Sequence, residues 1–133
     1  MGAQLQQKLL AADAYATALG ISWVSGSATE CVVSMTLGAD HLNFADVAHG
    51  GVIFSLADCA FSLASNAPGR LAVAVDTHLV IPAASHAGDL LTAHAVEVSL
   101  GNKLATYRVE VKGPGGQMVG LFTGTVYRTS RTH

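Results

Sequence analysis

One short stretch, residues 46–64, carries residue types suited to chemistry on a carbonyl group. His49, Gly50 and Gly51 come directly before a long apolar run, and Asp58 is the only charged residue inside that run. The first amides of a helix lack intrahelical acceptors and carry partial positive charge, so glycines there let a carbonyl oxygen approach the backbone. A carboxylate among apolar side chains is costly to keep ionised without partners or a cleft. These residues predict an oxyanion donor at Gly50 and a base or nucleophile at Asp58.

The spacing of these two groups has a consequence for assembly. Gly50 and Asp58 are eight residues apart, which is roughly 12 Å along one helix at the usual rise per residue. An oxyanion donor and a base must both lie about 3 Å from the reacting group. If both groups act, they therefore act from different chains. Two antiparallel copies of the helix about a twofold axis would bring them together, which predicts a homodimer with two shared sites.

The helix that carries these residues is expected to be enclosed by the rest of the chain. From residue 52 to residue 64, apolar side chains fall on nearly every side at helical spacing, a pattern typical of a buried helix. A thin polar stripe interrupts it at Ser55, Asp58, Ser62 and Ser65. Two structural explanations stay open: the glycines could serve only to admit the chain into a crowded helix start, and Asp58 could be held by a neighbouring serine hydroxyl.

The flanking segments predict an α+β protein of one domain over residues 1–133. Residues 1–20 are predicted to form an N-terminal helix, periodic from Gln4 to Leu19, and residues 129–133 a flexible tail. Patterns typical of strands cover 21–24, 30–37, 71–81, 89–100, 104–112 and 117–128. No crossover helix follows residue 66, so the strands after the central helix must pair in antiparallel fashion. The pattern predicts an antiparallel sheet wrapped around a long central helix.

Composition excludes several classes of function. The chain has 12% charged residues and a formal net charge of −2, and its basic residues are scattered, which argues against nucleic-acid binding. No apolar run approaches the roughly 18 residues that cross a bilayer, and the N-terminus lacks the features of a secretory signal, so we expect no membrane association and a cytoplasmic protein. The mean hydropathy of +0.42 favours contact with another subunit. Cys31 and Cys59 are expected to be inert, and the histidine spacing fits no metal site.

The motifs carry a resemblance. His41-Leu42-Asn43, His49-Gly50-Gly51 and Leu56-Ala57-Asp58 resemble the motif of hotdog-fold acyl-CoA thioesterases, in the branch of the phenylacetic acid degradation thioesterase. The likeness extends over most of the chain. Residues 77–82 are similar to the second strand of that family, and the following Gly88-Asp89 is similar to the segment that leaves this strand. Two departures are Asp46, where the family usually has glycine, and the apolar residues 71–75, where some relatives hold water with a hydroxyl.

The resemblance implies a fold, an assembly and an activity. The fold is the sheet wrapped around the helix, and the assembly is an antiparallel dimer, often paired into a tetramer. The activity is hydrolysis of small, aromatic acyl-CoA thioesters of the phenylacetyl or hydroxyphenylacetyl type, without cofactor or metal. The resemblance also assigns roles by position. Asp58 is the base or nucleophile, and the Gly50 N–H from the partner subunit is the oxyanion donor. Asn43 polarises the substrate or places the water, and His49 binds near the thioester.

Further residues are predicted to bind the substrate. Thr77 is the substitute for the missing water-holding hydroxyl, and Phe44 is a candidate for lining the acyl pocket. Basic side chains near turns are candidates for the phosphates of coenzyme A, although ordinary solvated charges would look the same. The predicted binding residues are Gly51, Ser62, Thr77, Phe44, Arg70 and Lys103, with Arg128 as a third basic candidate.

Two alternative functions stay open at this stage. A non-enzymatic domain of this fold could bind acyl-CoA without hydrolysing it, although it would have no use for Asp58. A hydratase of this fold would need an Asp and His pair before the helix to add water to an enoyl-CoA, and Asp46 and His49 are only three residues apart.

Overall fold

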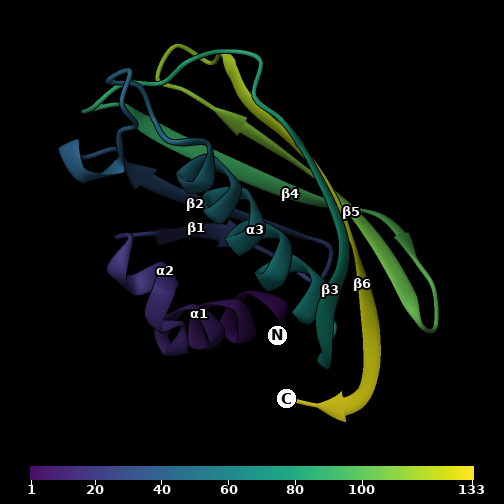
Figure 1. The fold of residues 1–133 in the computed structure, drawn as a ribbon. Coiled ribbons are helices and arrows are strands. Elements are labelled where there is room, and N and C mark those ends of the chain that lie inside the picture. Colours follow the sequence, from purple (N-terminus) through teal and green to yellow (C-terminus); the bar gives the residue numbers. More distant parts are fainter.

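The computed structural model describes residues 1–133 and shows a helix enclosed by a curved antiparallel sheet (Figure 1). The helices are α1 (Gly2–Ala12), α2 (Ala14–Ala18) and α3 (Gly50–Asn66), with a short 3-10 turn at Ala39–His41. The strands are β1 (Ser22–Gly26), β2 (Glu30–Thr36), β3 (Arg70–Val80), β4 (Leu90–Leu100), β5 (Leu104–Lys112) and β6 (Met118–Thr132). Their order in the sheet is β1-β2-β4-β5-β6-β3, and every neighbouring pair is antiparallel. The predicted fold is confirmed.

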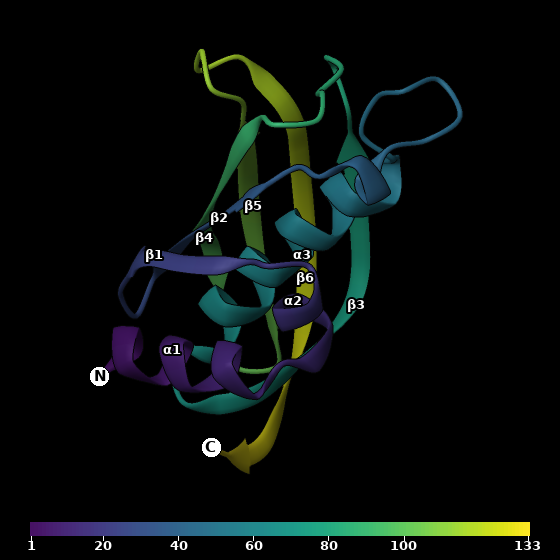
Figure 2. The same ribbon diagram turned by 90° about the vertical axis from the view of Figure 1, so that its left-hand side faces the viewer.

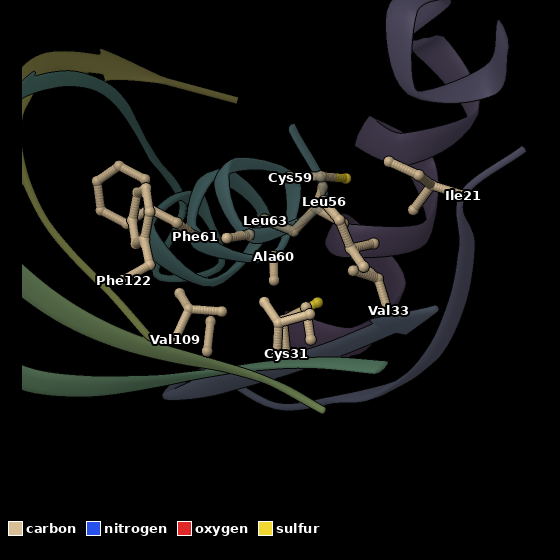
Figure 3. Packing of buried hydrophobic residues seen from close by; sticks show 14 of the residues in the cluster. Ile21, Cys31, Val33, Leu56, Cys59, Ala60, Phe61, Leu63, Val109 and Phe122 are labelled. Carbon is tan, nitrogen blue, oxygen red and sulfur yellow. The ribbon is translucent and has the colours of Figure 1, made fainter. Parts of the chain in front are cut away.

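The core lies between α3 and the concave face of the sheet, as the apolar helix pattern predicts. Leu56, Ala60 and Phe61 of α3 are completely buried, and Figure 3 shows these side chains packed toward the strands. The Phe61 ring lies 5.3 Å from the Phe122 ring between centroids. A side chain at Gly124 would come within 2.8 Å of both rings, so glycine is required at this close approach.

The N-terminal helix differs from its prediction. Residues 1–20 form two helices, α1 and α2, rather than one. The chain breaks at Asp13, whose backbone is extended and whose side chain accepts a hydrogen bond from the Ala16 N–H at 2.9 Å. Aspartate competes with helical hydrogen bonding in this way, which makes it a good N-cap and a poor interior residue. The break turns α2 across α3 (Figure 2).

The prediction of a flexible tail at residues 129–133 is wrong. β6 continues to Thr132, which pairs with Arg70 at the start of β3. The polar composition of this segment resembles a tail, but Thr129 donates its hydroxyl to the Leu71 carbonyl at 2.7 Å and Arg70 donates to the Thr129 carbonyl at 2.9 Å. Side chains of one strand therefore bind the backbone of its neighbour and hold the end of the sheet.

β3 is an edge strand with a bulge in its middle. It pairs only with β6, and its register shifts between Ala74 and Asp76. Alternation along a strand would put Ala72, Ala74 and Asp76 on one face, but the extra residue at the bulge moves Thr77 to the face of Ala74 instead. Leu79, two residues further along, packs against the core, in agreement with this shift. The bulge therefore turns Thr77 toward α3.

No helix combines the length and the apolar character needed to cross a bilayer.

Candidate active site

The start of α3 leaves one backbone amide without an acceptor. His49 is the N-cap, and its Nδ1 accepts a hydrogen bond from the Gly51 N–H at 2.8 Å. The Val52 and Ile53 N–H groups both donate to the His49 carbonyl. Gly50 N–H donates to no group of the chain. Of the amides at this helix start, Gly50 N–H is the one available to an external oxygen.

The loop before α3 is shaped by Asn43. Its Oδ1 accepts from the Ala45 N–H at 2.8 Å and from the Val47 N–H at 3.4 Å, so the Nδ2 end of the amide points away from these bonds and donates to nothing in the chain. Asp46 has φ +59°, a left-handed conformation that aspartate tolerates better than most residues other than glycine. Phe44 is fully exposed on this loop, which projects from the body of the fold (Figure 2).

Asp58 lies half-buried on the face of α3 that the sheet does not cover. Its carboxylate accepts no hydrogen bond and forms no ion pair within the chain, which excludes the structural explanation based on Ser55 or Ser62. The hydroxyl of Ser55 instead donates to the Gly51 carbonyl at 2.8 Å. Burial raises the pKa of Asp58, and the negative charge of Asp13 raises it further.

Two cavities meet at Asp58 and Phe54. The larger is an open groove of about 520 Å³ toward β3, where Thr77 lines the opposite wall. The smaller has a volume of about 150 Å³ and lies under α2, with Asp13, Tyr15 and Ser62 among its lining residues. The structure therefore brings Asp58 together with the predicted Thr77 on one side and the predicted Ser62 on the other.

The three basic candidates gather in a different place. Arg70, Lys103 and Arg128 surround a hollow of about 480 Å³ at the far end of β3. The Arg70 guanidinium donates to the Asn102 and Arg128 carbonyls at 2.9 and 3.0 Å, so it is held by backbone groups rather than by a carboxylate. Lys103 is exposed at the rim.

Within one chain the predicted residues form separate groups. Asn43, His49, Gly50 and Gly51 surround the start of α3, while Asp58 lies about 12 Å along the same helix. Phe44 lies at the exposed loop and lines neither cavity at Asp58. The basic residues lie beyond the C-terminal end of α3.

Sequence reasoning missed Asp13 and Tyr15. Both line the smaller cavity beside Asp58, and the Tyr15 hydroxyl lies 2.9 Å from Ser55 Oγ. A signal was present: Asp13 is the only acidic residue in the periodic segment 4–19, and its position three residues before Ala16 fits an N-cap. That signal did not indicate which surface of the protein α2 would cover.

Comparisons with known proteins bear on the family and the fold. A family model described as "Thioesterase superfamily" matches residues 45–119. A protein of Archaeoglobus fulgidus is 50% identical over 98 residues, which are 74% of this chain and only 64% of the length of that relative. The acyl-coenzyme A thioesterase PaaI of Escherichia coli is 39% identical over 90% of this chain and 86% of its own. The solved structure of the E. coli PaaI protein from the phenylacetic acid degradation operon has a TM-score of 0.95 at 37% identity, covering 97% of this chain and 94% of that chain.

The effect of the Asp13 charge on Asp58, with which it lines one cavity, gives a first testable prediction. Replacing Asp13 with Asn keeps an N-cap side chain but removes the charge, so the pKa of Asp58 should fall, because its ionised form no longer faces a like charge. The measurement is an NMR titration of the Asp58 carboxyl carbon. Glu110→Gln, between the buried Val109 and Val111 of β5 and therefore on the outer face of the sheet, is the matched control and should leave the pKa of Asp58 in place. An unchanged Asp58 titration in Asp13→Asn would contradict the assignment.

Proposed function

Because the chain belongs to the thioesterase superfamily, we propose that it hydrolyses acyl-CoA thioesters at a site shared by two chains, Asp58 coming from one and the Gly50 N–H from the other. The observation that carries this proposal is the pair of unsatisfied groups on α3. Gly50 N–H donates to nothing, and the Asp58 carboxylate accepts nothing. Each is suited to one side of a thioester carbonyl, and neither has another use in the chain.

The reaction follows from the charges that these groups carry. Ionised Asp58 takes a proton from water while the water oxygen attacks the thioester carbon; attack by the carboxylate itself is the other route. The Gly50 N–H donates to the carbonyl oxygen as negative charge develops there. The tetrahedral intermediate then collapses and the carbon–sulfur bond breaks. The proton held by Asp58 passes to the departing thiolate, so coenzyme A and the free acid are released and Asp58 is ionised again. The raised pKa of Asp58 makes it a stronger base than an ordinary aspartate.

Three further side chains are assigned supporting roles. The free Nδ2 of Asn43 donates to the substrate or to the water, and the Thr77 hydroxyl holds the water across the groove from Asp58. His49 acts through its Nε2, because its Nδ1 already accepts the Gly51 N–H. That bond also occupies the Gly51 amide, so the proposed oxyanion donor is Gly50 alone.

Assembly into a dimer follows from the same requirement. The open edge of β3 exposes apolar side chains, with Val73, Val75 and Val80 each about half exposed, and unpaired strand edges of this kind favour pairing with a second strand. An antiparallel partner would bring its own α3 alongside and would cover the exposed Phe44. Pairing of two dimers into a tetramer is part of the proposal, because Val98 and Leu104 stay exposed elsewhere on the sheet.

The finer substrate assignment is also proposed. The E. coli relative is named as an acyl-coenzyme A thioesterase, and the Arg70, Lys103 and Arg128 hollow supplies three cations for the phosphates of coenzyme A. In the proposed antiparallel pair, the C-terminal half of α3 in one chain would lie beside the start of α3 in the other chain. The hollow of the first chain would then lie at the same end of the helix pair as its own Asp58 and the Gly50 of the other chain. Aromatic acyl groups of the phenylacetyl type are the proposed substrates.

The two alternatives receive less support. A hydratase would use Asp46, but this residue is exposed in the loop, and His49 Nδ1 is occupied at the helix start. A domain that only binds acyl-CoA would gain nothing from a carboxylate kept unpaired at Asp58. Hydration of crotonyl-CoA by the purified protein, without thiol release from any acyl-CoA, would favour the first alternative.

Asp58→Asn tests the proposed base. Turnover of phenylacetyl-CoA, followed by thiol release, should fall by roughly 100-fold or more, which is typical for removal of a positioned acid–base group. The melting temperature should rise, because the raised pKa of Asp58 means that its ionised form destabilises the fold above its unfolded-state pKa. Loss of activity with a lower melting temperature would instead indicate misfolding, and full activity would exclude Asp58 as the base or nucleophile.

Gly50→Pro tests the oxyanion donor. Gly50 is the first helical residue, where proline fits and removes little except the N–H, and His49 already has the extended backbone that proline requires before it. The kcat should fall by roughly 100- to 1000-fold. Gly50→Ala is the matched control, because it adds the same Cβ beside Ile81 but keeps the N–H. Equal losses of kcat in Gly50→Pro and Gly50→Ala would show that the added side-chain volume, rather than the missing N–H, lowers the activity.

Mixing these two inactive variants tests whether the site is shared. After co-refolding, half of the dimers contain one Gly50→Pro chain and one Asp58→Asn chain, and each of these has one intact site of its two. The mixture should recover about one quarter of wild-type activity. Mass spectrometry would confirm that mixed dimers have formed. If their activity does not recover, Asp58 and the Gly50 N–H of each site belong to the same chain.

Lys103→Ala tests the phosphate hollow. The KM for phenylacetyl-CoA should rise several-fold, while kcat changes little, because Lys103 is exposed and distant from Asp58. The control substrate is the phenylacetyl thioester of N-acetylcysteamine, which has no phosphates and should show no such rise. Equal KM values for wild type and Lys103→Ala with phenylacetyl-CoA would remove Lys103 from the binding site.

A further inference from the structure

The first residue of α3 touches a side chain that is distant in the sequence. A Cβ placed on Gly50 would lie 3.3 Å from Ile81 Cδ1. Apart from the adjoining residues and the backbone of α3 itself, no other atom comes within 4 Å of that position. Ile81 directly follows β3, which ends at Val80. The end of the edge strand therefore closes one side of the helix start.

The direction of this contact matters for the Gly50 N–H. In an α-helix the Cα–Cβ bonds tilt toward the N-terminus, and the free N–H groups of the first turn point the same way. A group beside the Cβ position of the first helical residue therefore borders the space in front of its N–H. Ile81 Cδ1 occupies this place, so an oxygen bound at the Gly50 N–H has an apolar neighbour on that side.

We propose that Ile81 is the apolar wall of the oxyanion site, and that its side chain keeps water away from the Gly50 N–H during the reaction. The inference rests on the proposed function and adds a positioning residue to it. A hydrogen bond to developing negative charge is stronger where water is excluded, because the local dielectric constant is lower. Ile81 thus acts through the Gly50 amide and not on the reacting atoms themselves.

The connection between β3 and β4 holds Ile81 in place. Pro82 follows Ile81 and restricts the backbone of Ile81 to extended conformations. Further along, the Ser85 carbonyl accepts a hydrogen bond from the Ala48 N–H at 2.8 Å. This bond ties the connection to the residue two positions before Gly50. The wall and the amide that it covers are therefore parts of one fastened unit.

The surroundings of Ile81 are apolar and carry no charge. It is one of the residues around a hollow of about 280 Å³, and none of them has a charged side chain. Ser85 is the only one with a polar side chain, and it is 2% exposed, with a buried hydroxyl that has no hydrogen-bond partner in the chain. Water beside Gly50 therefore finds no accessible polar side chain to bind, which favours its exclusion. The residues that line the hollow are Val47, Ala48, Ile53, Ile81, Pro82, Ala83, Ala84 and Ser85.

Ile81→Ala tests the wall. It opens the space beside Gly50 to water, so kcat for phenylacetyl-CoA should fall by about tenfold, while KM should stay within about twofold of wild type. Ile81→Leu keeps a side chain of the same size and should retain most of the wild-type kcat. Leu121→Ala, on the outer face of β6 beside the buried Phe122, is the matched control and should change neither constant. An unchanged kcat in Ile81→Ala, or a rise in KM alone, would overturn the inference.

A double variant separates an effect through the Gly50 amide from general damage to the fold. Gly50→Pro has no N–H for the wall to shield. Adding Ile81→Ala to Gly50→Pro should therefore lower kcat by less than about twofold, against about tenfold when Gly50 is present. A second tenfold loss would show that Ile81 acts independently of the amide and would overturn the inference.

The same measurements distinguish a failure of this inference from a failure of the proposed function. If wild type hydrolyses no acyl-CoA, or if Gly50→Pro keeps the wild-type kcat, the proposed function itself is wrong. If Gly50→Pro loses activity as expected but the effects of Gly50→Pro and Ile81→Ala on kcat simply multiply, the proposed function stands and only the role of Ile81 is wrong.

Discussion

The fixed rise per residue of an α-helix is the constraint on which the proposed site depends. α3 fixes the Gly50 amide and the Asp58 carboxylate on one rigid rod, about 12 Å apart. The concave face of the sheet packs against one side of α3, and α2 lies beside the part of the polar stripe that includes Ser55. No loop movement within one chain can shorten the distance between two residues of the same helix. If both groups act on one thioester, as proposed, a second chain must therefore complete the site.

A second constraint is the burial of charge. The Asp58 carboxylate has no donor in its own chain, and Asp13 adds a like charge nearby. This arrangement opposes stability at neutral pH, and a folded protein tolerates it because the apolar contacts of α3 with the sheet are extensive. The same features that raise the pKa of Asp58 make it a better proton acceptor. Stability and reactivity therefore conflict at this residue.

Patterns that depend on local chemistry were readable from the sequence. The apolar run of α3, the glycines at its start and the strand at Leu104–Lys112 are each specified by their own residues, and the structure places them as expected. Features that depend on distant partners were not readable. The segment after Arg128 is polar and resembles a tail, yet it forms a strand because Arg70 and Leu71 bind its backbone and hydroxyl groups.

The bulge in β3 shows how one residue links the open edge of the sheet to the site. Without it, Thr77 would lie on the opposite face of β3 from Ala74. With the bulge, Thr77 lines the groove at Asp58, together with Asp76. The irregularity therefore changes which side chains line the groove, and alternating hydrophobicity alone could not reveal it.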